Sequence, residues 1–189
     1  MPKLWSDTID AHRRAVHAAI LDAAWALAAE HGVLSVTMSQ VAERAGVGRA
    51  TLYKYFHDVE AILVAHHHRH VAEHLQQLAE VRRHHAQAGE RLVALLRLYA
   101  GICHRRGRHG SVDLDALLHR EQHVADSRRQ LADLFREVLA EAGEVGQVRR
   151  DVPAEELATY CLRALEAAGE LPSEDAVDRL VAVTLAGLK

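Results

Sequence analysis

Residues 37–63 read TMSQVAERAGVGRATLYKYFHDVEAIL and predict two short helices joined by a tight turn. Small apolar residues recur at helical spacing in the first half, after Ser39, which we expect to cap the first helix. Gly46 then supplies a residue without a Cβ at the point where this helix must stop and reverse. A second helix is expected from Arg49 to Phe56. Two short helices around a glycine turn are typical of a DNA-reading helix-turn-helix.

The second predicted helix separates buried from exposed side chains. We expect Leu52 to be buried, which turns Arg49, Ala50 and Thr51 outward. Arg49 is the best candidate for a bidentate contact to guanine, and Ala50 and Thr51 can meet a thymine methyl group. Tyr53 has an alternative role, because a tyrosine ring can also pack against apolar neighbours. Polar side chains that can contact DNA phosphates complete the predicted DNA surface, namely Thr37, Ser39, Tyr53, Lys54, Tyr55 and His57.

This segment resembles the DNA-binding domain of the TetR family of one-component bacterial transcription regulators. The resemblance rests on many positions in register and not on the glycine turn alone. They are Arg13, Ile20, Leu21, Ala24, Gly32, Thr37, Val41, Ala42, Ala45, Gly46, Val47, Thr51, Leu52, Tyr53, Tyr55, Phe56, Glu60 and Leu63. The resemblance implies an all-helical homodimer whose N-terminal domain binds operator DNA and whose C-terminal domain holds a small-molecule inducer. It implies no cofactor.

Two positions depart from the family pattern. Gly48 stands where a serine or a similar capping residue is usual, and Val59 stands where a phosphate-binding lysine often lies. Both changes remove anchors for the DNA backbone. We therefore expect His57 and the start of the following helix to carry more of the phosphate contact.

Composition favours an all-α fold. The chain has 189 residues, of which 49% are hydrophobic and only 4% aromatic, and its three prolines leave long segments free of helix breakers. We expect about nine helices in two domains: residues 1–57 form the helix-turn-helix DNA-binding domain, and residues 58–189 form a helical domain for inducer binding and dimerisation. The first predicted helix runs from about residue 6 to residue 31 and precedes the two helices of the motif. Six more helices are predicted after the motif, at about 59–84, 90–106, 113–124, 131–143, 154–168 and 173–188.

The last two predicted helices, the eighth and the ninth, are broadly apolar. They either close the core of one chain or pair with their equivalents about a two-fold axis. We favour the homodimer, because a two-fold DNA reader needs its recognition helices about one helical turn apart, ~34 Å, to meet a palindrome.

Charge and hydropathy limit the kinds of molecule that we expect the chain to bind. The formal net charge is −3, and residues 1–57 carry six basic and five acidic side chains, so non-specific DNA affinity should be modest and sensitive to salt. No apolar run is long enough to span a membrane and no signal-peptide pattern is present. We expect a cytoplasmic protein without a membrane partner, in which both cysteines serve packing.

Fifteen histidines are the second unusual feature, and several crowd the predicted helix 59–84. At 100° per residue, an inward apolar stripe is centred on Val71, and His66 lies well outside it. His67, His70 and His74 follow one flank of this stripe. The i, i+4 spacing of His70 and His74 can hold one metal ion.

These histidines have two alternative uses. Residues of later helices could complete either one, namely Tyr99, Cys103, His104, His119 and His123. One is an organic inducer pocket lined by polar rings, and the other is a metal-ion-responsive regulator. We favour the organic inducer and predict no metal site, because no third ligand of cysteine or carboxylate type stands at a matching spacing.

An enzyme is the rival class of function. The sequence contains no HExxH, no Glu-x-x-His pair for a di-iron bundle, no P-loop and no nucleophile elbow. The sequence thus gives little support to a helical metalloenzyme, and even less to a purely structural helical protein. We predict a ligand-responsive DNA-binding regulator, most simply a repressor.

Overall fold

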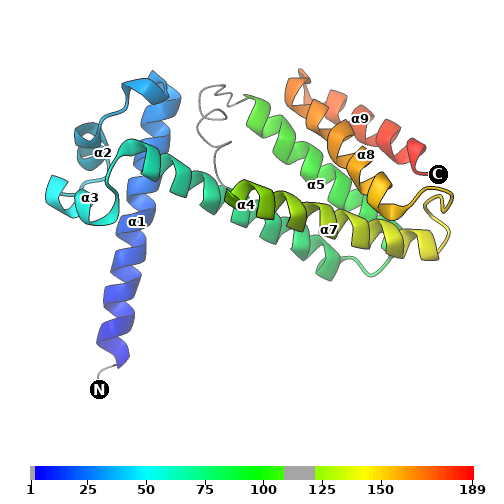
Figure 1. The fold of residues 1–189 in the computed structure, drawn as a ribbon, viewed down its shortest axis with the longest axis horizontal. Coiled ribbons are helices and arrows are strands. Elements are labelled where there is room, and N and C mark those ends of the chain that lie inside the picture. The colour runs from blue at the N-terminus through cyan, green and yellow to red at the C-terminus, as the bar shows by residue number, and fades with distance from the viewer. Residues whose placement is uncertain (1–2, 109–121) are drawn as a thin grey trace. The chain divides into compact units, whose positions relative to one another are not determined.

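The structure, a computed structural model, describes residues 3–108 and 122–189. Within these residues every regular element is a helix, which confirms the all-α prediction (Figure 1). The α-helices are α1 (Lys3–His31), α2 (Met38–Arg44), α3 (Arg49–Tyr55), α4 (Val59–His84), α5 (Ala88–Arg108), α7 (Gln122–Glu144), α8 (Ala154–Glu166) and α9 (Glu174–Gly187). Two 3₁₀ turns join them, η1 (Val33–Ser35) and η2 (Ala167–Glu170). The predicted helix 113–124 lies mostly outside the described residues, and its last three residues belong to α7.

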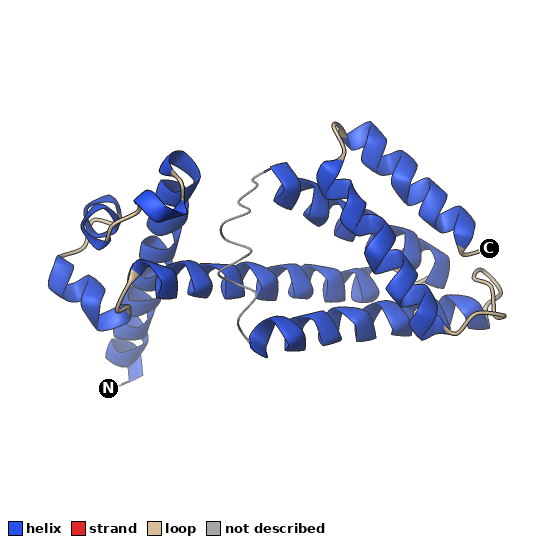
Figure 2. Cartoon of the chain, turned by 45° about the horizontal axis from the view of Figure 1, so that its top comes forward, coloured by secondary structure: helices blue, strands red, loops and turns tan. Residues whose placement is uncertain are grey.

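The described residues divide into two compact units. The first unit contains residues 3–70, and the second contains residues 71–108 and 122–189. The division falls inside α4, so this one helix contributes to both units (Figure 2). The domain division at residues 57 and 58 stays a prediction from the sequence.

A single apolar core holds the first unit together. Ile20 and Leu21 of α1, Val41 of α2, Leu52 of α3 and Ile62 of α4 are almost completely buried and pack in one cluster. Each of the four helices therefore contributes to the same core. Burying a large apolar side chain stabilises the fold by roughly 1.5–3 kcal/mol, so this core fixes the short α2 and α3, which could not be stable alone.

The N-terminal cap of α2 is Thr37, and the prediction of Ser39 as the cap is wrong. The Thr37 side chain accepts a hydrogen bond from the Gln40 backbone N–H, and the Gln40 side chain accepts one from the Thr37 backbone N–H at 2.9 Å. This reciprocal pair is a capping box. Ser39 lies two residues after the cap, inside the helix and exposed.

The turn between α2 and α3 depends on Gly46, whose φ of 66° lies in the left-handed region. Its N–H donates to the carbonyl oxygen of Glu43 at 3.1 Å, and the N–H of Val47 donates to that of Ala42 at 3.0 Å. These bonds satisfy the last carbonyl groups of α2. The predicted glycine turn is confirmed.

α4 begins and ends where the sequence indicated, but it does not have a single inward face. Asp58 caps the helix by accepting a hydrogen bond from the Ala61 N–H at 2.7 Å. In the first unit α4 buries Ile62 and Leu63, and with them His66, whose side chain is only 3% exposed. In the second unit it buries Leu78. The placement of His66 well outside the inward stripe is wrong, because that stripe describes only the half of α4 in the second unit.

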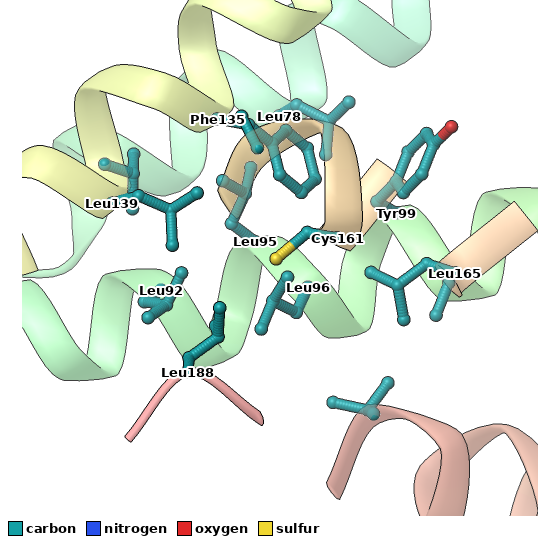
Figure 3. Close-up of a cluster of buried hydrophobic side chains, with 14 of the residues drawn as sticks. Leu78, Leu92, Leu95, Leu96, Tyr99, Phe135, Leu139, Cys161, Leu165 and Leu188 are labelled. Atoms are coloured by element: carbon teal, nitrogen blue, oxygen red, sulfur yellow. The ribbon is translucent and has the colours of Figure 1, made fainter. Parts of the chain in front are cut away.

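The core of the second unit forms around α5, which contacts α7, α8, α9 and η2. Leu95 and Leu96 of α5 are fully buried together with Phe135 of α7 and Leu165 of α8 (Figure 3). The Tyr99 ring meets the Phe135 ring edge-on, with 5.3 Å between the ring centroids. Both cysteines are free and buried in this unit, in agreement with a packing role. None of the described helices is long and apolar enough to cross a membrane.

The C-terminal end of α5 packs backbone to backbone against η2. A Cβ placed on Gly107 would lie 2.0 Å from the carbonyl oxygen of Gly169, and a Cβ placed on Gly169 would lie 3.3 Å from that of Cys103. Only glycine at Gly107 permits this approach. The contact joins the end of α5 to the segment between α8 and α9.

Gly107→Ala should therefore destabilise the protein by about 2 kcal/mol or more, because a backbone carbonyl group must move to admit the methyl group. Gly101→Ala is the matched control in the same helix, since its Cβ would meet only the end of the Arg105 side chain at 3.4 Å. That change should stabilise the protein by roughly 0.5–1 kcal/mol, the usual gain of alanine over glycine inside a helix. Urea unfolding followed by circular dichroism would measure both, and equal stability of the two variants would contradict the close approach.

Candidate nucleic-acid interface and ligand-binding residues

One face of α3 packs on the core of the first unit, and the other face is exposed to solvent. Leu52 is fully buried in the core of the first unit, and Phe56, the residue after the helix, is buried beside it. Arg49, Ala50 and Lys54 are exposed, and Tyr53 is 53% exposed. The face predicted to meet DNA is thus accessible.

Two further residues of α3 lie at the edge of this face. Thr51 and Tyr55 are partly buried, and the Tyr55 ring lies 6.2 Å from the His17 ring of α1. Gly48 is the N-cap of α3 and forms no side-chain cap, as its identity requires. The first backbone N–H groups of α3 therefore receive no hydrogen bond acceptor from the side chain of the N-cap residue.

The predicted phosphate-contacting residues outside α3 are all exposed. Thr37 and Ser39 are exposed at the start of α2. His57 is exposed between α3 and α4, and its Nε2 lies 3.1 Å from Oδ2 of Asp58.

The cations near α3 are not equivalent. Arg44 of α2 makes two hydrogen bonds of 2.6 Å to the carboxylate of Glu30, and this contact lowers the pKa of the Glu30 carboxyl group and raises that of Arg44. Among the described residues, neither Arg49 nor Lys54 forms an ion pair. Although the net charge of the region is small, α3 itself carries two cations without an ion-pair partner in the described part of the chain, Arg49 and Lys54. Such placement focuses positive charge where a phosphate backbone would approach.

The candidate ligand residues of α4 do not form a cluster of metal ligands. His67 and His74 are partly buried and His70 is exposed. Within the described part of the chain, no group of three or more histidine, cysteine, aspartate or glutamate side chains is arranged to hold a metal ion.

Tyr99 and Cys103 lie one turn apart on α5 and are buried in the second unit, whereas His119 lies outside the described residues. Burial is the main cause that raises the pKa of the Tyr99 hydroxyl and of the Cys103 thiol, so both groups stay protonated at neutral pH. The structure thus brings Tyr99 and Cys103 together as neutral hydrogen-bonding groups in an apolar surrounding.

His104, next to Cys103, is among the residues that the sequence indicated as able to complete the site, and it is a buried polar residue. It is 4% exposed, and its Nδ1 lies 3.0 Å from the carbonyl oxygen of Ala168. Because a carbonyl group can only accept, Nδ1 donates the hydrogen of this bond. Nε2 is buried and makes no hydrogen bond with any described residue. The alternation of apolar residues along α5 could not indicate this, since the partner Ala168 is distant in sequence.

His66 forms an aromatic stack in the first unit. Its ring lies nearly parallel to that of Trp25, with 4.6 Å between the centroids, and His70 lies at the same distance on a tilted plane. Burial, followed by the charges of His70 and Arg69, lowers the pKa of His66 to about 4. His66 is therefore neutral at neutral pH and serves as a packing residue of α4 against α1.

Two family models match the chain. Residues 20–65 match the model of bacterial regulatory proteins of the tetR family, and residues 105–189 match the C-terminal domain of SbtR-like transcriptional regulators. The chain belongs to the TetR family of transcriptional regulators. The first match contains α2, α3 and the core residues beneath them. It follows that this TetR-family protein is a DNA-binding regulator and not an enzyme.

Solved structures with the same fold support this assignment. A TetR/AcrR-family regulator from Thermobifida fusca has 20% sequence identity and a TM-score of 0.77, over 92% of this chain and 98% of that one. FadR from Bacillus subtilis in complex with stearoyl-CoA has 16% identity and a TM-score of 0.64, over 90% and 98%. The complex of SmeT with triclosan has 23% identity and a TM-score of 0.67, over 93% and 92%. At these identities the likeness concerns the fold. Among curated protein sequences, none matches the chain.

The buried His66 makes stability depend on pH. Its pKa of about 4 lies below the 6.5 expected for an unfolded chain, so its contribution is complete above pH 6.5 and is lost as the pH falls toward 4. Between pH 7 and pH 5 we expect His66 to account for a loss of about 2 kcal/mol in the free energy of unfolding.

His66→Phe keeps an aromatic ring against Trp25 and should flatten this pH dependence by about that amount in urea unfolding. His57→Gln is the control, because the His57 side chain is 83% exposed. If His66→Phe were as steep as wild type between pH 7 and pH 5, His66 would not be buried in its neutral form.

Proposed function

We propose that this protein is a ligand-responsive regulator, most simply a repressor, that binds a palindromic operator as a dimer and is released by a small-molecule inducer. The observation that carries the proposal is the arrangement of α3. Leu52 anchors the helix in the core, while the uncommitted Arg49 and Lys54 face solvent.

In this proposal α3 is the recognition helix in the major groove. Arg49 donates two hydrogen bonds to a guanine, and Ala50 and Thr51 meet a neighbouring thymine methyl group. Lys54 and Tyr53 contact phosphates. Thr37, Ser39, Gly48, Tyr55 and His57 lie around α3 and complete the predicted contact surface. With few cations available, base contacts carry more of the affinity than phosphate contacts do.

Dimerisation through α8 and α9 holds two recognition helices together. Val183 of α9 is 66% exposed, and Ala182 and Ala186 of the same helix are also exposed. Tyr160 of α8 is exposed and lies against Gly187 at the end of α9. Exposed apolar side chains on two adjacent helices favour contact with the same helices of a second copy, in a four-helix interface.

The inducer site lies in the second unit. FadR from Bacillus subtilis binds stearoyl-CoA and SmeT binds triclosan, both partly apolar molecules. Here Tyr99 and Cys103 are neutral and buried, and Nε2 of His104 is buried without a hydrogen-bond partner among the described residues. An apolar molecule with at least one hydrogen-bonding group fits these side chains. His67, His70, His74 and His119 are further candidate contacts.

α4 connects the inducer site to the DNA surface. It is one continuous helix that buries Ile62 and His66 in the first unit and Leu78 in the second. An inducer that binds one position of α4 better than another shifts the population of dimers away from the form that fits two successive major grooves. Operator DNA must then weaken inducer binding by the same factor.

The test is to select bound duplexes from a random DNA pool at near-physiological salt and then to measure affinities for the consensus. We expect a palindromic consensus. Arg49→Ala should weaken binding to it by about 10-fold or more and relax the preference at one base pair in each half-site, which corresponds to roughly 1–3 kcal/mol per bidentate contact.

Arg44→Ala is the matched control, because Arg44 is engaged by Glu30 and lies off the recognition face. It should keep the specificity of wild type. A folded wild-type protein that enriches no sequence, or an Arg49→Ala variant with unchanged preference, would contradict the proposed recognition.

The proposed dimer contact can be tested separately in solution. Val183→Glu places a charge in the predicted interface and should convert the dimer to a monomer in size-exclusion chromatography with light scattering. Val145→Glu is the control, because Val145 is 61% exposed in the loop after α7. A Val183→Glu variant that stays dimeric at micromolar concentration would exclude this part of α9 from the interface.

A further inference from the structure

A groove opens at one end of the second unit, and its lining does not include the proposed inducer residues Tyr99 and Cys103. Its volume is about 960 Å³. The start of α5, the loop between α7 and α8, and the end of α9 line it and lie together at this end of the unit (Figure 1). A volume of this size is at the upper end of the range for small-molecule sites.

The floor of the groove is apolar. Leu92, Val93 and Ala94 of α5 form one side, and Val148 of the loop and Leu185 of α9 form the other. Leu92 and Val148 are buried in the core of the second unit. The floor therefore continues the packed core and offers a hydrocarbon body a surface already shielded on one side.

Backbone hydrogen bonds fix the loop that forms one wall. The N–H of Gln147 donates to the carbonyl oxygen of Ala142 at 2.9 Å, and the N–H of Arg149 donates to that of Leu188 at 2.8 Å. Gly146 makes the reversal with a φ of 73°. The wall is thus tied to α7 at one end and to α9 at the other, which gives the groove a defined shape without a ligand.

Basic side chains outnumber acidic ones among the residues that line the rim. Arg149 is engaged by Asp151 through two hydrogen bonds of 2.8 and 2.6 Å. Arg97 and Lys189 also line the groove and are exposed, and among the described residues neither pairs with a carboxylate. Glu90 is the acidic side chain of the lining. Two uncommitted cations beside an apolar floor match a molecule with a hydrocarbon body and an anionic head.

We propose that this groove is a binding site for an amphipathic anion, with the hydrocarbon body on Leu92, Val93 and Leu185 and the anionic head at Arg97 and Lys189. The site is separate from the inducer residues in the core. It does not depend on whether the chain binds an operator, since the groove belongs entirely to the second unit.

The test is a fluorescence titration of the full chain, without DNA, with 11-(dansylamino)undecanoate. The double variant Arg97→Glu/Lys189→Glu should bind this probe at least 10-fold more weakly than wild type. Arg136→Glu is the matched control, because Arg136 is an exposed arginine of α7 that does not line the groove. It should change the affinity less than 2-fold.

Displacement of the probe by unlabelled compounds tests whether the site requires an anionic head group and whether the probe binds in the groove. Decanoate should displace the probe from wild type at least 10-fold more effectively than decanol. Equal competition by decanol, or a double variant that binds the probe as wild type does, would overturn the proposal and place the probe in the neutral core. A double variant with unchanged probe binding but altered oligomeric state would overturn it in favour of a contact between copies of the chain.

Discussion

The left-handed backbone at Gly46 is the constraint on which the DNA surface depends. At a φ of 66°, a residue with a Cβ would cost roughly 1–2 kcal/mol, whereas glycine adopts this conformation freely. The turn stops α2 at Arg44 and lets α3 begin at Arg49. Leu52 then falls into the core, and Arg49 and Lys54 are left outside. Recognition chemistry at α3 is thus a consequence of where one helix is forced to end.

In α4, the sequence predicts the ends of the helix correctly but not all of its buried residues. The sequence located its ends through Asp58 and His84, because capping is a local interaction. The prediction that His66 lies outside the buried face failed, because counting 100° per residue from Val71 assumes that one core runs along the whole helix. α4 contributes Ile62 and Leu63 to the core of the first unit and Leu78 to the core of the second. The error at Ser39 is different in kind, since the reciprocal pair of Thr37 and Gln40 is a local pattern that was available in the sequence.

Other features of the site depend on residues that are distant in sequence. The burial of Leu52 and the spacing of Tyr99 and Cys103 follow from helical periodicity and could be predicted. The hydrogen bond of His104 depends on Ala168, and the close approach at Gly107 depends on Gly169. The groove beside α9 needs three segments to converge. None of these is encoded in a local pattern, because each arises only when helices pack.

The central claim is that two copies of α3 read DNA about one helical turn apart. Hydroxyl-radical footprinting of the wild-type protein on a duplex obtained by selection tests it most directly. The account predicts two groups of protected backbone positions, related by a two-fold axis and centred about 10 base pairs apart or at a small multiple of that spacing. A single protected patch without symmetry, on a duplex that the protein binds tightly, would contradict it.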